Sequence, residues 1–171
     1  MEEKLLLCLR DILKENQFET ELLEAKEGQN PMILRIESKR NGKVMQDVLY
    51  ELCFIPLKLP RENTALLQFY VTLFTGLMDN YFYEVSKACD YCNSFSAIGS
   101  FGLFRPAGQL YLKQNVVLDL TDSLEKLANQ AVDNLSLLMA SVAKFIDPLA
   151  AIGNGATTLE LAKESDMLPQ M

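Results

Sequence analysis

Apolar residues at the start of the chain recur at the spacing of an amphipathic helix. Over residues 2–16, one side of such a helix would carry Leu5, Leu9, Ile12 and Leu13. Charged residues fill much of the opposite side, which would face water. We predict an N-terminal helix that packs through its apolar side.

The pattern then changes to the alternation that is typical of β-strands. Residues 18–25 are a weak first candidate, and Gly-Gln-Asn-Pro at 28–31 predicts a turn. Residues 32–38 form a clearer strand. Its apolar side would carry Met32, Leu34 and Ile36.

Asn41-Gly42 predicts a hairpin after this strand, because both residues tolerate positive φ. The return strand is expected over residues 44–55, and Pro56 and Pro60 would end its pairing. Its alternate positions are Val44, Val48, Tyr50, Leu52 and Phe54.

The segment "ALLQFYVTLF" at 65–74 fits two periods. Helical spacing is present, and so is strict alternation, with Gln68 and Thr72 on the outer side. The aromatic and β-branched content favours a strand. The inner side of that strand would carry Leu67, Phe69, Val71 and Leu73.

A second helix is expected over residues 79–93, with Asp79 as its cap. Two strands around Pro106-Ala107-Gly108 follow within residues 101–120, and Gly108 supplies a permissive backbone for the turn. The inner side of the second strand would carry Leu110, Leu112, Val116 and Leu118.

The longest helix would begin after Thr121 or Asp122, either of which can cap it. Apolar residues then recur at spacings of three and four as far as Phe145, and Pro148 with Gly153 and Gly155 is expected to end the ordered helix.

Runs of adjacent strands separated by helices predict an α+β fold. We expect an antiparallel β-sheet of five to six strands packed with an N-terminal, a central and a long C-terminal helix. Residues 1–150 would form a single domain, and residues 151–171 a short tail or a loosely held helix.

Charge and composition narrow the function. The formal net charge is −7, and scattered basic residues argue against nucleic-acid binding. The chain has no histidine, which removes the commonest catalytic base and all histidine-containing metal sites. We find no signal peptide and no apolar run that approaches a membrane span, so we expect a cytoplasmic protein that does not bind membranes.

The remaining candidates for chemistry have simpler explanations. Cys89 and Cys92 form a C-x-x-C pair late in a helix, on its apolar side, where buried structural thiols are expected. The glycines at 153 and 155 lack the lysine of a phosphate loop and predict a helix end. Acidic pairs such as Asp119 with Asp122 lie at helix starts, where capping explains them. We expect no catalytic residue, no cofactor and no metal.

Some apolar residues fall on the outer sides of these elements. Tyr111, Val117 and Leu137 are the clearest cases, and uncovered apolar surface is typical of a partner site. Plain core packing together with homodimerisation remains the alternative reading of the apolar positions in the last helix.

Residues 66–146 resemble the YbjN family, whose fold is like that of type III secretion chaperones. The matching residues are "LLQFYVTLF", a helix ending in "ACDYCNSFS" with a late Asn93, "GSFGLFRPAGQLYLKQNVVL", and the amphipathic helix that follows. The resemblance implies a small acidic protein, often dimeric, without a known enzyme activity. Chaperones of this shape hold an extended segment of another protein.

Two further hypotheses stand beside a chaperone-like interaction module that binds a protein or peptide partner as a homodimer. One is a small carboxylate-based enzyme or ligand-binding domain, which would need a deep pocket with at least two acids. The other is a regulatory subunit of a larger assembly.

Overall fold

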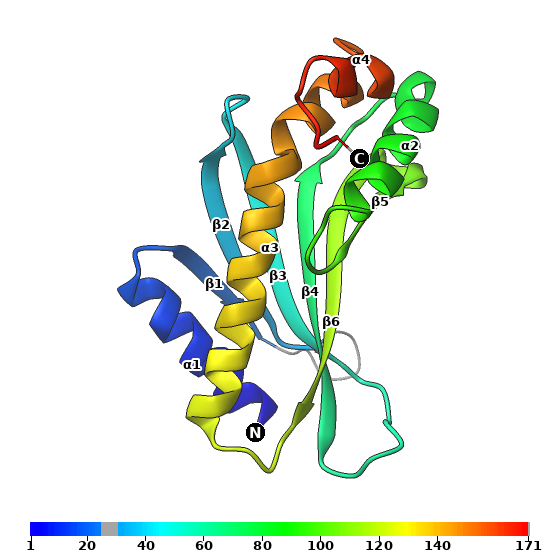
Figure 1. Cartoon of the computed structure of the whole chain (residues 1–171). Coiled ribbons are helices and arrows are strands. Elements are labelled where there is room, and N and C mark those ends of the chain that lie inside the picture. The colour runs from blue at the N-terminus through cyan, green and yellow to red at the C-terminus, as the bar shows by residue number, and fades with distance from the viewer. Residues whose placement is uncertain (25–30, 171) are drawn as a thin grey trace.

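The computed structural model describes residues 1–24 and 31–170 and shows the predicted α+β fold (Figure 1). A six-stranded antiparallel sheet has the order β1-β2-β3-β4-β6-β5. The turn predicted at 28–31 lies largely outside the described residues. The strands are β1 (Glu19–Leu23), β2 (Ile33–Asn41), β3 (Gln46–Ile55), β4 (Thr64–Phe74), β5 (Ser100–Phe104) and β6 (Gln109–Asp119).

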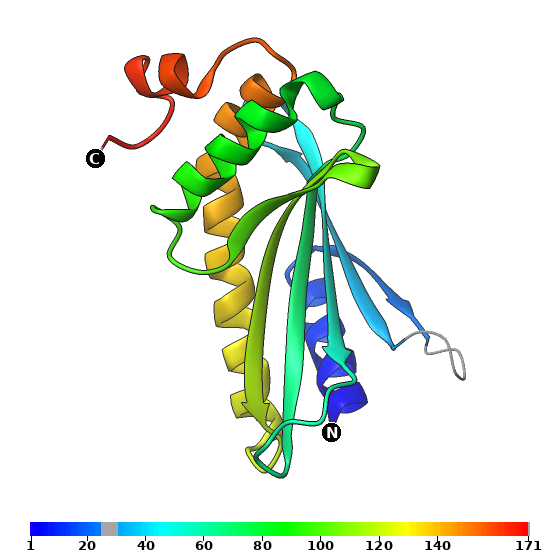
Figure 2. The same ribbon diagram turned by 90° about the vertical axis from the view of Figure 1, so that its right-hand side faces the viewer.

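The three main helices pack against one face of the sheet, as Figures 1 and 2 show for α1 (Glu2–Glu15), α2 (Phe82–Asn93) and α3 (Leu124–Gly153). Strand β4 lies near the middle of the sheet, and the strand prediction for residues 65–74 is confirmed. Its side chains that point toward the helices are all buried: Ala65, Leu67, Phe69, Val71 and Leu73.

Helix α3 supplies most of the helical side of the core. Its length and composition would also allow it to cross a membrane, but half of its most apolar window is buried within the fold. This is the arrangement of a core helix in a soluble domain. The helix end predicted at Gly153 and Gly155 is confirmed, because α3 ends at Gly153, but Pro148 does not end the helix and lies inside it. Burial of Phe145, Leu149 and Ile152 around the proline offsets its helix penalty of about 3 kcal/mol.

The predicted caps of α2 and α3 are also wrong. Ser123 caps α3, because its Oγ accepts a hydrogen bond from the Lys126 amide at 3.3 Å. The Asp122 carboxylate instead pairs with the Lys126 ammonium at 2.8 Å. Asp79 begins a short 3-10 turn before α2 and makes no side-chain cap.

The β2–β3 hairpin has a longer loop than the Asn-Gly pattern predicts. Asn41 remains in β2 opposite Gln46, and residues 42–45 form the loop, with positive φ at Gly42 and Met45. Val44 is therefore an exposed loop residue and does not begin the return strand. Its amide donates to Asp147 Oδ1 at 3.1 Å, which fixes the hairpin tip to α3.

The segment after residue 150 is packed on the domain. Residues 151–153 are still part of α3, although the predicted domain ended at residue 150. A short helix, α4 (Leu159–Glu164), comes next. Leu159, Ala162 and Leu168 are buried, and α4 contacts α2 and α3. The Tyr91 hydroxyl also donates to the Pro169 carbonyl at 2.6 Å.

Candidate protein-binding surface

The second face of the sheet carries no helix of the described residues, and we call it the open face (Figure 2). It consists of the alternate strand residues whose side chains point away from α1, α2 and α3. Most are half-buried by their neighbours, and a few are well exposed. The open face contains Ile33, Arg35, Leu49, Glu51, Cys53, Ile55, Leu66, Gln68, Tyr70, Thr72, Tyr111, Lys113, Asn115 and Val117.

Three aliphatic residues form a row across the open face. Leu66 of β4 pairs directly with Ile55 of β3 on one side and with Val117 of β6 on the other. Directly opposed side chains in antiparallel strands are in contact. Val117 is 54% exposed, so this apolar row ends at accessible surface.

An aromatic pair lies higher on the same face. The rings of Tyr70 and Tyr111 stack with centroids 5.2 Å apart. The Tyr111 ring lies over Gly102, because a Cβ built at Gly102 would be 2.6 Å from it. Burial, the nearby Tyr111 and the Glu51 carboxylate together raise the pKa of the Tyr70 hydroxyl. The two stacked rings thus form a partly exposed aromatic surface.

Hydrogen-bonded polar side chains lie between the aliphatic row and the aromatic pair, and also beyond the aromatic pair. Gln68 Nε2 donates to Asn115 Oδ1 at 3.0 Å. On the far side of the pair, Gln109 Nε2 donates to the Thr72 hydroxyl at 2.8 Å. The open face therefore alternates apolar and hydrogen-bonding rows.

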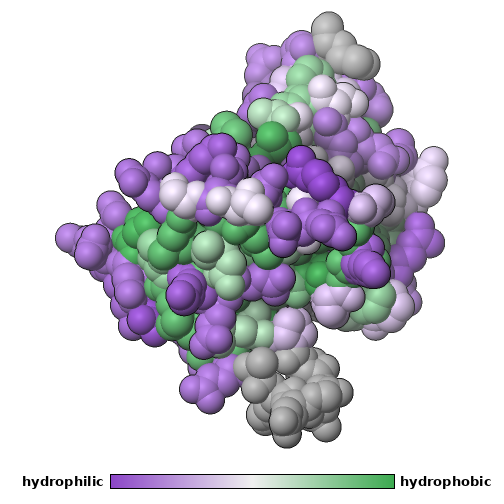
Figure 3. Space-filling view, turned by 90° about the horizontal axis from the view of Figure 1, so that it is seen from below, coloured by the Kyte–Doolittle hydropathy of each residue, from purple (hydrophilic) through white to green (hydrophobic). Residues whose placement is uncertain are grey.

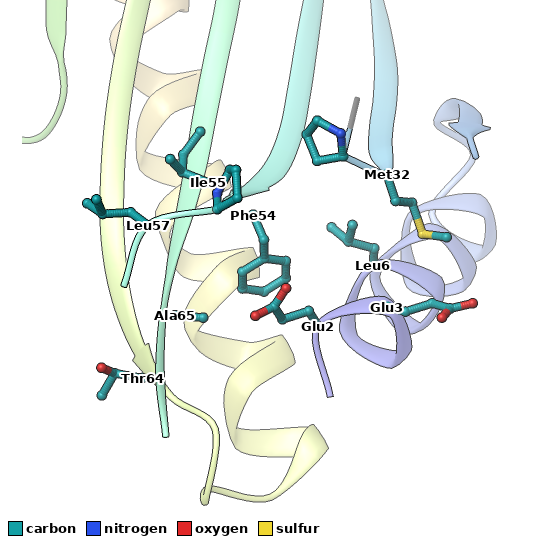
Figure 4. Close-up of a pocket in the computed structure, with 11 residues that line it drawn as sticks. Glu2, Glu3, Leu6, Met32, Phe54, Ile55, Leu57, Thr64 and Ala65 are labelled. Carbon is teal, nitrogen blue, oxygen red and sulfur yellow. The ribbon is translucent and has the colours of Figure 1, made fainter. Parts of the chain in front are cut away.

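A pocket of about 420 Å³ opens at the lower end of the sheet, and we call it the basal pocket (Figure 4). Figure 3 shows apolar surface between hydrophilic residues at this end of the molecule. Ile55 belongs both to the aliphatic row and to the pocket wall. The pocket is lined by Glu2, Glu3, Leu6, Pro31, Met32, Phe54, Ile55, Pro56, Leu57, Thr64 and Ala65.

The acids of the basal pocket do not form a carboxylate pair. Figure 4 shows the Glu2 carboxylate beside the Phe54 ring and the Glu3 carboxylate pointing away from it. Both residues lie in the first turn of α1, where a helix favours negative charge.

The acidic pair predicted from the sequence is also used locally. Asp119 Oδ1 accepts hydrogen bonds from the Thr121 hydroxyl at 2.6 Å and from its amide at 3.1 Å, which lowers the pKa of Asp119. Asp122 pairs with Lys126. These contacts give both carboxylates a structural role at the turn between β6 and α3.

The three partner-site residues predicted from the sequence do not lie on one surface. Tyr111 and Val117 both lie on the open face of β6. Leu137 is 45% exposed but belongs to α3, in the helical layer on the other side of the sheet. Leu66 and Tyr70 were missed, although they flank Gln68 at the spacing of two that places them on its side of β4.

Cys89 and Cys92 are buried thiols on α2, as predicted. Burial raises the pKa of each thiol to about 12. We expect both thiols to resist alkylation of the native protein at pH 8 and to react once urea unfolds it, with mass spectrometry locating each label. Fast native labelling would contradict the packing of α2.

The same pKa shifts predict the direction of a pH effect on stability. Unfolded thiols ionise near pH 9, whereas the folded ones remain protonated up to about pH 12. The unfolding free energy should therefore fall as pH rises through this interval, because ionisation favours the unfolded chain. The double variant of Cys89→Ala and Cys92→Ala should show a shallower decline in urea titrations.

Comparisons with protein-family models and with curated proteins found no match to this chain. The resemblance to the YbjN family therefore stays a prediction from the residues quoted above. Within residues 1–24 and 31–170, no group of three or more Cys, Asp or Glu side chains is placed to hold a metal ion.

Proposed function

We propose that this protein is a non-enzymatic, cytoplasmic interaction module of the YbjN type, which holds an extended segment of another polypeptide in a chaperone-like way. One observation carries the proposal: the aliphatic row of Ile55, Leu66 and Val117 leads across the open face into the basal pocket. An apolar side chain of the bound segment would occupy the pocket, and its neighbours would lie along the row.

The negative charge near the basal pocket indicates which residues should flank the apolar anchor of the bound segment. Glu2 stands beside the apolar lining of the pocket, and the whole chain has a formal net charge of −7. A segment with an apolar anchor next to lysine or arginine therefore suits the site better than an acidic one.

Peptide binding tests the proposal. A panel of labelled peptides should contain a leucine or phenylalanine anchor with either basic or acidic flanks, and fluorescence anisotropy should report their affinities. We expect the basic-flanked peptides to bind more tightly. Leu57→Glu should weaken this binding by at least about tenfold, because it places a charge where the apolar anchor binds, and this cost exceeds the small attraction that one exposed glutamate adds for basic flanks.

Met45→Glu is the matched control for this experiment. Met45 and Leu57 are both 56% exposed, and both substitutions add one negative charge, but Met45 lies in the β2–β3 loop away from the pocket. The control should bind peptides as the unaltered chain does. Equal affinities of the two variants, or no binding by any peptide, would contradict the proposed function.

A further inference from the structure

The lower half of β6 is an unpaired sheet edge. Strand β4 pairs with β6 from Leu110 to Asp119, whereas β5 covers β6 only from Gln109 to Lys113. Residues 114–119 consequently have no strand beside them on one side within the described part of the chain. Figure 2 views this edge, with β4 on its paired side.

This edge lacks the devices that normally prevent strands from associating. Lysine, proline and charged side chains usually protect exposed edges. Residues 114–118 have the sequence Gln-Asn-Val-Val-Leu and carry no charge, and the charged residue of this edge, Asp119, stands at its end, where it pairs with Arg61. The opposite edge, β1, differs, because its Glu19 and Glu21 are exposed and lie near Lys39 and Arg35.

We propose that the β6 edge pairs with the β6 edge of a second copy of this chain, antiparallel, about a two-fold axis at Val117. Such pairing keeps both open faces on the same side, because opposed residues then share a face. Val117 meets Val117 of the other copy, and Asn115 meets Asp119. The aliphatic row of each chain then joins that of its copy at the axis.

The register with its axis at Val117 fits this edge better than the neighbouring register with its axis at Val116, which also keeps the faces matched. An axis at Val116 would oppose the exposed Val117 to the polar Asn115, whereas the axis at Val117 opposes valine to valine. The net charge of the chain also favours the β6 edge as the place where two copies meet. Copies with a formal net charge of −7 repel one another, so a close contact is most favourable where the surface is neutral.

Helix α3 can add apolar area on the same side. Ser141 contacts Ser96 of the loop between α2 and β5 at 3.2 Å, and this loop reaches β6, because the Gly99 amide donates to Gln114 Oε1 at 2.9 Å. Leu137 lies one helical turn before Ser141 on α3 and is 45% exposed.

Charge-swapped variants test the two-fold register. Sedimentation equilibrium should show a dimer for the unaltered chain. Val117→Lys alone and Val117→Glu alone should each weaken the dimer by at least about tenfold, because like charges meet at the axis. A one-to-one mixture of V117K and V117E should restore the dimer, because a lysine then faces a glutamate.

Val44→Lys provides the control, because Val44 is a similarly exposed valine, at 44%, in the β2–β3 loop. It should leave the dimer unchanged. A monomeric unaltered chain would overturn the proposal, as would a V117K variant that remains fully dimeric or a mixture that stays monomeric. The result is separable from the proposed function, because Leu57→Glu alters the pocket and not the β6 edge.

Discussion

Replacing Phe145 with alanine should lower the free energy of unfolding by about 3 to 5 kcal/mol. Phe145 is fully buried in α3, and its ring meets the Phe101 ring of β5 edge-on, with centroids 5.6 Å apart. The substitution removes this contact and leaves a cavity between α3 and the sheet. Urea denaturation should report the loss, and the melting temperature should fall by roughly 6 to 20 °C.

Phe104→Ala is the control for this prediction. Phe104 is 50% exposed at the end of β5, so its removal should change stability by no more than about 0.5 kcal/mol. If Phe145→Ala behaved like Phe104→Ala, α3 could not be packed on the sheet as described.

The second large effect is expected at Gly108, in the turn between β5 and β6. Gly108 has φ of +53°, and a Cβ there would lie 2.5 Å from the Leu77 carbonyl oxygen. Gly108→Ala should destabilise the fold by roughly 2 to 5 kcal/mol, since it adds left-handed strain and displaces the Leu77 backbone. That displacement would also strain the hydrogen bond from the Leu77 amide to the Gly108 carbonyl.

Gly76→Ala separates strain from collision. Gly76 has φ of +72°, yet a Cβ there would meet no atom within 4 Å. It should therefore show the conformational penalty alone, about 1 to 2 kcal/mol in urea denaturation. Equal losses for the two variants would show that the contact with Leu77 contributes nothing.

The sheet and its inner side could be predicted from the sequence because alternation is a local signal. Phe69 and Val71 in β4 alternate with Gln68 and Thr72, and the structure buries the first two as expected. Position within the sheet also matters. Because β4 pairs on both sides, even its outward Leu66 and Tyr70 are half-buried by neighbouring side chains.

The candidate site could be predicted only in part. Val117 and Tyr111 were predicted to face outward because they interrupt an otherwise polar side of β6, and both do lie on the open face. Leu137 was grouped with them because a helical projection shows only that it points outward. Its separation from the open face follows from the return of α3 across the opposite side of the sheet, a consequence of topology. The basal pocket likewise brings together Leu6, Met32 and Phe54, which are distant in the chain.

The predicted cap of α3 and its predicted end at Pro148 were wrong for a different reason. Asp119, Asp122 and Ser123 can all accept a backbone hydrogen bond near the start of α3, and the sequence alone does not rank them. The structure assigns Asp119 to the turn, Asp122 to an ion pair and Ser123 to the cap. Pro148 was misjudged because burial of the surrounding helix exceeds the local penalty of proline.

The position of α3 near the end of the chain has a consequence for protein synthesis. The strands β2 to β4 leave the ribosome before α3 does, and about 80 residues separate the end of β4 from the end of the helix that covers them. At translation rates of about 5 to 20 residues per second, this takes roughly 4 to 16 s. During that time Tyr50, Phe69 and their neighbours lack the cover of α3, and transiently exposed apolar surface of this kind makes a folding chain prone to aggregate.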